Sequence, residues 1–134
     1  MKAGNAVYAA LSDTKRRIYQ DGKTNSRPIL GHVSWDAENG AKIDSKAFFS
    51  SGVLELPPGG EIVQHKHSNR EELYYVLSGK GEATIDGVTT VMEPGILFWF
   101  PANCVHRILN PDKEATLLIF FATAVTEPGH MSHD

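Results

Sequence analysis

Two histidines one residue apart constrain this chain more than any other feature of its sequence. His65 and His67 lie in the segment 59–79, GGEIVQHKHSNREELYYVLSG, and an acidic pair, Glu71 and Glu72, follows them. Because side chains at positions i and i+2 of a β-strand share a face, both imidazoles are expected on one side of a strand. Two imidazole nitrogens near a carboxylate oxygen suit divalent first-row metals. The segment therefore indicates a strand that carries metal-binding side chains.

The residues after the histidines strengthen this interpretation, since a lone His-x-His also occurs on ordinary exposed strands. Residues 72–79 are rich in β-branched and aromatic side chains and end at a glycine, as is typical of a strand that leads into a turn. A hairpin-like return between His67 and Glu72 would bring the carboxylate back over the imidazoles. A third histidine, His106, follows in the segment 101–110, PANCVHRILN.

The spacing of these residues resembles the two motifs of the cupin family. The first, G(x)5HxH(x)3–4E(x)6G, is matched at Gly59, His65, His67, Glu72 and Gly79. The second, G(x)5PxG(x)2H(x)3N, is matched at Gly95, Pro101, His106 and Asn110. Asn103 stands where the family has glycine, and asparagine tolerates a positive φ better than other non-glycine residues.

The resemblance implies an all-β fold, a single-domain cupin jelly-roll β-barrel. It also implies one divalent metal with four ligands, which are His65, His67, Glu72 and His106. Fe or Mn is favoured, and Ni, Co, Cu and Zn suit the same donors. Glu71 is the rival carboxylate, but Glu72 is the one that lies seven residues before Gly79. Cupins often dimerise through outer strands, so a homodimer is expected.

Composition narrows the class of protein further. The chain has 134 residues, enough for one domain with a real core, and its net charge of −3 is mixed along the sequence. This pattern argues against a nucleic-acid partner. The single cysteine, Cys104, excludes an internal disulfide framework. The apolar run at residues 1–11 is too weak for a secretory signal and too short for a membrane span, so we predict a cytoplasmic protein without a membrane partner.

Three regions are predicted along the chain: residues 1–28 form an N-terminal arm or short helix, 29–126 the cupin barrel and 127–134 a flexible tail. An anion site at Lys15–Arg17 is the less favoured interpretation of the arm, and His130 and His133 are not expected to be ligands. Besides the strand of the first motif, strands are predicted at 29–35, 46–56, 72–77, 82–86, 88–92, 96–100, 105–109 and 115–123, with a polar loop at 36–44 that turns at Asn39-Gly40. About eight to ten short strands separated by turn residues indicate an antiparallel sandwich or barrel.

Strand parity predicts the surroundings of the metal. Tyr74 and Val76 should face inward with Glu72, while Tyr75 faces away. Cys104 and Ile108 share the parity of His106, so a largely apolar pocket wall is expected, with Tyr74 as the nearest protic group. One of the aromatic residues Phe98, Trp99 and Phe100 is expected to close part of the mouth.

Three functions follow from a centre with three neutral imidazoles and one carboxylate, which leaves two open positions if it is octahedral. The first is an Fe(II)-type oxygenase that acts on a small organic molecule. The second is a redox-neutral lyase, isomerase or cyclase in which Tyr74 transfers a proton. Cupin-type lyases of dimethylsulfoniopropionate resemble this chain in having a tyrosine two residues after the ligand glutamate. The third is a non-catalytic cupin that binds a small molecule or sugar.

Overall fold

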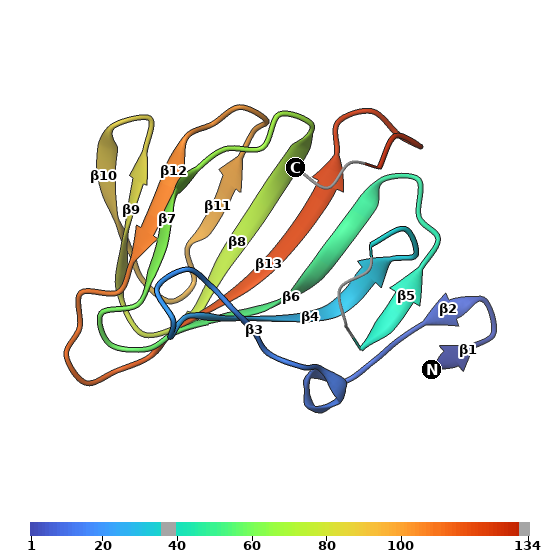
Figure 1. The fold of residues 1–134 in the computed structure, drawn as a ribbon, viewed down its shortest axis with the longest axis horizontal. Coiled ribbons are helices and arrows are strands. Elements are labelled where there is room, and N and C mark those ends of the chain that lie inside the picture. The colour runs from blue at the N-terminus through green and yellow to red at the C-terminus, as the bar shows by residue number, and fades with distance from the viewer. Residues whose placement is uncertain (36–39, 132–134) are drawn as a thin grey trace.

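The computed structural model describes residues 1–35 and 40–131, which form two facing β-sheets (Figure 1). The smaller sheet has the order β10 (Val88–Met92), β9 (Gly81–Ile85), β12 (His106–Leu109) and β7 (Glu61–His65). The larger has the order β11 (Leu97–Phe100), β8 (Arg70–Ser78), β13 (Leu117–Val125), β6 (Phe48–Leu56), β4 (Asn25–His32) and β3 (Arg17–Ile18), and β5 (Ala41–Ile43) also pairs with β4. A hairpin of β1 (Lys2–Ala3) and β2 (Ala6–Val7) and a 3-10 helix, η1 (Leu11–Asp13), precede them.

The core lies between the two sheets. Burial alternates along β8 and β13 because successive side chains of a strand point to opposite faces. The side chains that meet in the middle come from both layers, and they are Leu54, Leu56, Ile62, Tyr74, Val76, Ala83, Met92, Phe100, Cys104, Ile108, Leu117, Ile119 and Phe121. This all-β jelly-roll sandwich confirms the predicted fold class. The strands that the sequence did not predict, β1, β2, β3 and β5, have only two or three residues each.

The strand predicted at 29–35 is displaced, since β4 spans Asn25–His32. Pro28 lacks an N–H, which argues against a strand interior, yet β4 passes through it with a register shift between Pro28 and Leu30. Its partner at this point is Gly52, where a Cβ would lie only 2.2 Å from the carbonyl oxygen of Arg27. The bulge and the glycine together let a proline sit within the sheet.

Other boundaries differ in smaller ways. The loop predicted at 36–44 contains β5, which pairs in parallel with β4; residues 36–39, including Asn39, lie outside the described residues, as does His133. His130 is exposed and pairs with Glu127 at 3.6 Å. The division at 28/29 stays a prediction, although β3 and the start of β4 already join the larger sheet.

The outer face of the larger sheet exposes large apolar side chains. Those on neighbouring strands β8, β11 and β13 are Leu73, Tyr75, Leu77, Leu97, Trp99 and Phe120. The expected homodimer stays a prediction. The described residues include no helix long and apolar enough to cross a membrane.

Asp21 ties the N-terminal segment to the sandwich. Its carboxylate accepts hydrogen bonds from the backbone N–H groups of Lys23, Thr24 and Glu61, at 3.0, 2.8 and 2.8 Å, and from the Thr24 hydroxyl. Burial raises the pKa of this carboxyl, but the hydrogen bonds from Thr24, Glu61 and Lys23 outweigh that effect and lower the pKa from 3.8 to about 2.

We expect Asp21→Ala to lower the free energy of unfolding by about 1–2 kcal/mol at pH 7, because four donors lose a charged acceptor that solvent partly screens. Since the pKa is lower in the folded chain, the stabilisation is complete above pH 4 and is lost as the pH falls toward 2. Urea unfolding at pH 7 and pH 3 should show the difference from wild type narrowing in acid. Exposed Glu93→Ala is the control, and a difference that widened in acid would contradict the assignment.

Candidate metal centre

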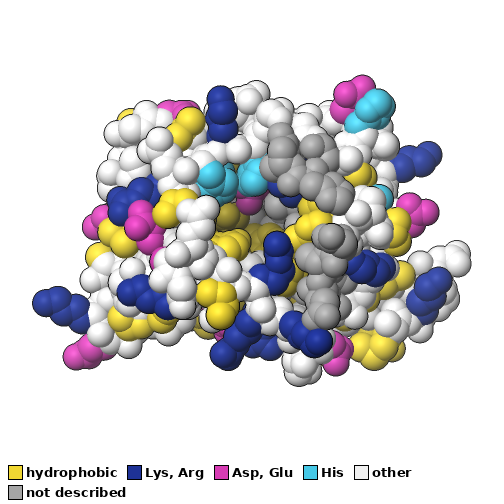
Figure 2. Space-filling view, in the orientation of Figure 1, with side chains coloured by type: hydrophobic (Ala, Val, Ile, Leu, Met, Phe, Trp, Pro, Cys, Tyr) yellow, Lys and Arg dark blue, Asp and Glu magenta, His cyan; other side chains and the backbone are white. Residues whose placement is uncertain are grey.

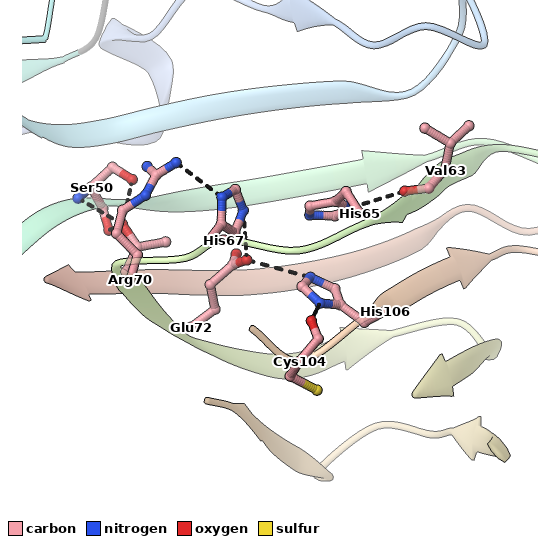
Figure 3. Close-up of polar contacts among 9 residues, drawn as sticks. Ser50, Val63, His65, His67, Arg70, Glu72, Cys104 and His106 are labelled. Carbon is pink, nitrogen blue, oxygen red and sulfur yellow. Dashed lines mark hydrogen bonds and ion pairs between the residues drawn. The ribbon is translucent and has the colours of Figure 1, made fainter. Parts of the chain in front are cut away.

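The four residues singled out by the sequence come together where the two sheets face each other (Figure 3). His65 ends β7 and His106 begins β12, and these two residues are register partners with ring centroids 4.2 Å apart. Glu72 projects from β8 of the opposite sheet and is 5% exposed. Ligand atoms of His65, Glu72 and His106 all lie within 4.8 Å of one another.

Two details of the first motif differ from expectation. His67 lies beyond the end of β7, in the connection to β8, rather than beside His65 on one strand. The predicted hairpin-like return is also wrong, because β7 pairs with β12 whereas β8 pairs with β11 and β13 in the other sheet. The chain crosses from one layer to the other after His67, so Glu72 approaches the imidazoles across the sandwich.

The structure separates the two candidate carboxylates. Glu71 lies on the outer face of β8, where it accepts a hydrogen bond of 2.8 Å from the indole nitrogen of Trp99. Neighbouring residues of a strand point to opposite faces, so Glu72 faces inward. The glycine spacing and the strand geometry therefore agree on Glu72.

Hydrogen bonds orient two of the three imidazoles for coordination. Nδ1 of His65 donates to the carbonyl of Val63 at 2.9 Å, and Nδ1 of His106 donates to the carbonyl of Cys104 at 3.0 Å. With the proton held on Nδ1, Nε2 of each ring presents its lone pair to the centre. Burial lowers the pKa of His65, which favours the neutral form that binds metal.

His67 is held differently. A guanidinium nitrogen of Arg70 lies 3.1 Å from its Nδ1, and because arginine only donates, Nδ1 accepts this hydrogen bond. A neutral ring in this arrangement carries its proton on Nε2, which lies 3.0 Å from Oε1 of Glu72. His67 can therefore become the fourth ligand through Nε2 only if its proton moves to Nδ1, which requires the contact with Arg70 to change.

The buried carboxylate fits a cation. Burial raises the pKa of Glu72, but the imidazoles of His106 and His67 outweigh this effect and hold the pKa well below its usual range. Oε1 of Glu72 lies 3.0 Å from Nε2 of His67 and 3.4 Å from Nε2 of His106, and among the described residues Nε2 of His106 is buried without a hydrogen-bond partner. Donor atoms that approach closely without bonding to one another are what a divalent cation would satisfy.

Two cavities open beside Glu72 and Tyr74, with volumes of about 190 and 380 Å³, and both also contact Tyr19 and His67. The smaller is lined by Arg17, Tyr19, Ser26, Trp35, Ser50, Leu54, His67, Arg70, Glu72, Tyr74, Phe121 and Thr123. The expectation of a largely apolar wall is therefore wrong for the smaller cavity, whereas the larger cavity includes Ile18, Ile62 and Val63 in its wall. Figure 2 shows histidine side chains at the rim of the hollow and basic side chains around it.

Sequence reasoning missed the contribution of the N-terminal arm to this wall. Tyr19 follows β3 and reaches the centre because β3 lies at the end of the larger sheet, a placement that no local pattern encodes. Parity did succeed elsewhere: Tyr74 and Val76 are buried, whereas Tyr75 is exposed. Among the three aromatic candidates, Phe100 stacks on His106 with ring centroids 4.4 Å apart.

Among known protein families, a model described as a cupin domain matches residues 52–122. The chain belongs to the cupin family. Dimethylsulfoniopropionate lyase DddW of Ruegeria pomeroyi is 27% identical over 75% of the chain and 65% of that protein. Quercetin 2,3-dioxygenase of Bacillus subtilis is 38% identical over 39% of the chain and 15% of that protein. The chain thus spans less than two thirds of either relative.

A solved cupin-like structure supports the fold alone. A predicted oxalate decarboxylase from Thermotoga maritima superposes with a TM-score of 0.72, covering 89% of this chain and 99% of that chain at 19% identity. The likeness extends beyond the matched motif region to most of the described sandwich.

We expect His65→Ala, Glu72→Ala and His106→Ala each to reduce bound metal at least tenfold, because each removes one of three donor atoms that lie within 4.8 Å of one another. Glu71→Ala is the matched control and should retain metal, since its carboxylate faces outward. Elemental analysis of each purified variant, with circular dichroism to check folding, is the measurement. Full occupancy in His106→Ala, or loss of metal in Glu71→Ala alone, would overturn the ligand set.

Asn103 supports the centre through its backbone. Its φ of +65° is in the left-handed region, as predicted for a position where the family has glycine. Its N–H donates to the carbonyl of His67 at 2.7 Å, which ties the connection between β7 and β8 to the turn before His106.

We expect Asn103→Gly to keep both the fold and the metal, because glycine adopts this φ without strain. Asn103→Val should lower the melting temperature, because a β-branched residue is strained there. Thermal melting and metal content check both variants. Unfolding of Asn103→Gly would instead reveal an essential bond of the asparagine side chain.

Proposed function

We propose that this cupin is a metal-dependent enzyme that acts on a small organic molecule by a redox-neutral proton transfer, as a lyase, isomerase or cyclase. The observation that carries the proposal is the burial of the Tyr74 phenol beside Glu72, on the face of β8 that looks into both cavities. A divalent cation bound by His65, Glu72 and His106, with His67 as a fourth donor, would polarise a carbonyl or carboxylate group of the substrate.

The surroundings of Tyr74 determine whether its phenol is protonated. Its ring meets Phe100 and His106 edge-on, with centroids 5.0 and 6.2 Å away. Burial raises the pKa of the phenol well above 10, and the charge of Glu72 adds to that effect. The protein alone therefore keeps Tyr74 protonated at neutral pH and makes it a weak acid. A role as base needs the opposing influence of a nearby cation.

The similarity to dimethylsulfoniopropionate lyase DddW supports this chemistry, because it extends over three quarters of the chain. An Fe(II)-type oxygenase, which the sequence alone placed first, is the second candidate. The shorter similarity to quercetin 2,3-dioxygenase favours it. An oxygenase has no need of a buried phenol in the wall, whereas proton transfer does, and this difference reverses the order of the two candidates.

We expect metal-loaded protein to convert a small organic substrate without consuming dioxygen. Tyr74→Phe should then lower kcat by about 10²–10⁴ with metal content unchanged, because general acid–base catalysis contributes on that scale. Tyr75→Phe, on the outer face of the same strand, is the matched control. A substrate screen with an oxygen electrode and product analysis by mass spectrometry makes the measurement.

The same assay separates the alternatives. Oxygen consumed in proportion to product would establish the oxygenase instead. An effect of Tyr74→Phe confined to KM would give the phenol a positioning role. Tight binding of a small molecule or sugar with no conversion under any metal would identify a non-catalytic binding protein.

A further inference from the structure

The smaller cavity beside Glu72 carries two guanidinium groups, of which that of Arg70 contacts the proposed donor His67 and that of Arg17 contacts none of the four proposed donors through a hydrogen bond. We propose that this cavity binds a carboxylate group of the substrate, with Arg17 as the residue that recognises it and Arg70 as a second source of positive charge. This inference rests on the proposed function, since it names the class of molecule that the same site accepts. It assigns a role to part of the segment Lys15–Arg17, which sequence alone favoured as a simple surface arm.

Aromatic rings hold both guanidinium groups in place. The central carbon of Arg17 lies 4.7 Å from the ring centroid of Trp35, and that of Arg70 lies 4.6 Å from the ring of Phe49. A guanidinium stacked on a ring is oriented by cation–π attraction. Arg70 also donates a hydrogen bond to Nδ1 of His67, whereas Arg17 presents its N–H groups at the edge of its contact with Trp35. Those N–H groups match the planar geometry of a carboxylate, which can accept two of them at once.

The charge of the cavity favours an anion. Two guanidinium groups and the single carboxylate of Glu72 line it, so the lining is net positive before any cation is counted. Among the described residues, no carboxylate forms an ion pair with Arg17, whereas its neighbour Arg16 lies 3.8 Å from Glu55. A divalent cation would increase the positive potential, so a neutral or cationic ligand would leave it uncompensated in a partly dry site.

Hydroxyl groups complete the polar wall. Ser50 and Thr123 are both buried and lie 2.9 Å from each other through their hydroxyl oxygens. Buried Ser26 interacts with the Tyr19 phenol at the boundary with the larger cavity. A volume of about 190 Å³ is smaller than the pockets that take drug-sized ligands. These features together fit a carboxylate with only a few carbon atoms, one end of which reaches Glu72 and the metal donors.

The test compares malonate with malonamide, a neutral molecule of similar size, on the purified protein with its metal content measured. A Trp99→Phe background leaves Trp35, which lines the cavity, as the sole tryptophan reporter of binding by fluorescence. We expect malonate to bind at least tenfold more tightly than malonamide. Arg17→Gln should weaken malonate binding about tenfold, the scale of one charge-assisted hydrogen bond, with metal content unchanged.

Arg16→Gln is the matched control, because it removes the same charge from the adjacent residue outside the cavity and should leave malonate binding unchanged. Arg17→Lys, which keeps the charge, should retain most of the binding. Equal weakening in Arg16→Gln and Arg17→Gln would overturn the proposal, since it would reveal only a diffuse charge effect. A second result would also overturn the proposal: malonate binding is lost when the metal is removed but is unchanged in Arg17→Gln. The cation alone would then hold the carboxylate.

A failure of the proposed enzymatic function would give a different combination of binding and turnover results. Binding needs no turnover, so Arg17-dependent binding of malonate in a protein that converts no carboxylate would remove the enzymatic function and leave the carboxylate site intact. Conversion of a substrate by a protein that binds malonate and malonamide equally would support the enzymatic function and remove the carboxylate site.

Discussion

The buried carboxylate of Glu72 is the constraint on which the rest of this site depends. An ionised carboxylate loses its hydration in the core, and that cost is tolerable only where opposite charge or oriented dipoles replace water. Here Glu72 stands on the larger sheet, the imidazole of His106 stands on the smaller one, and that of His67 stands on the connection between them. The attraction between Glu72 and the imidazoles therefore acts between the two sheets, and it favours one position of the smaller sheet relative to the larger one near Glu72.

The backbone supports this balance from several directions. The carbonyls of Val63 and Cys104 hold the rings of His65 and His106 in the tautomer that leaves Nε2 open. The N–H of Asn103 holds the connection that carries His67. Most of these partners lie within two or three residues of the histidine they orient, so the sequence positions the rings and their supports together.

Much of the fold and of the donor set could be predicted from sequence because both depend on short periods and fixed spacings. Alternation along 72–77 assigned the faces of Tyr74 and Tyr75, and the distance to Gly79 selected Glu72 over Glu71. The crossing from β7 to β8 could not be predicted, because a hairpin and a change of layer need the same few residues. The composition of the cavity wall could not be predicted either. Tyr19 lines the same cavity as Glu72 because of the order of strands in the larger sheet, and no local sequence pattern indicates that order.

The residues of the candidate site fall into two consecutive parts of the chain. Every proposed metal donor lies within 52–122, the part matched by the cupin model, whereas Arg17, Tyr19, Ser26, Trp35 and Ser50 all precede it. The proposed metal donors and much of the wall of the smaller cavity thus lie in separate, consecutive stretches of the chain. Changes confined to the first fifty residues would therefore alter the cavity wall without altering the proposed donors, and the pairing of Pro28 with Gly52 is one place where the two stretches must fit together.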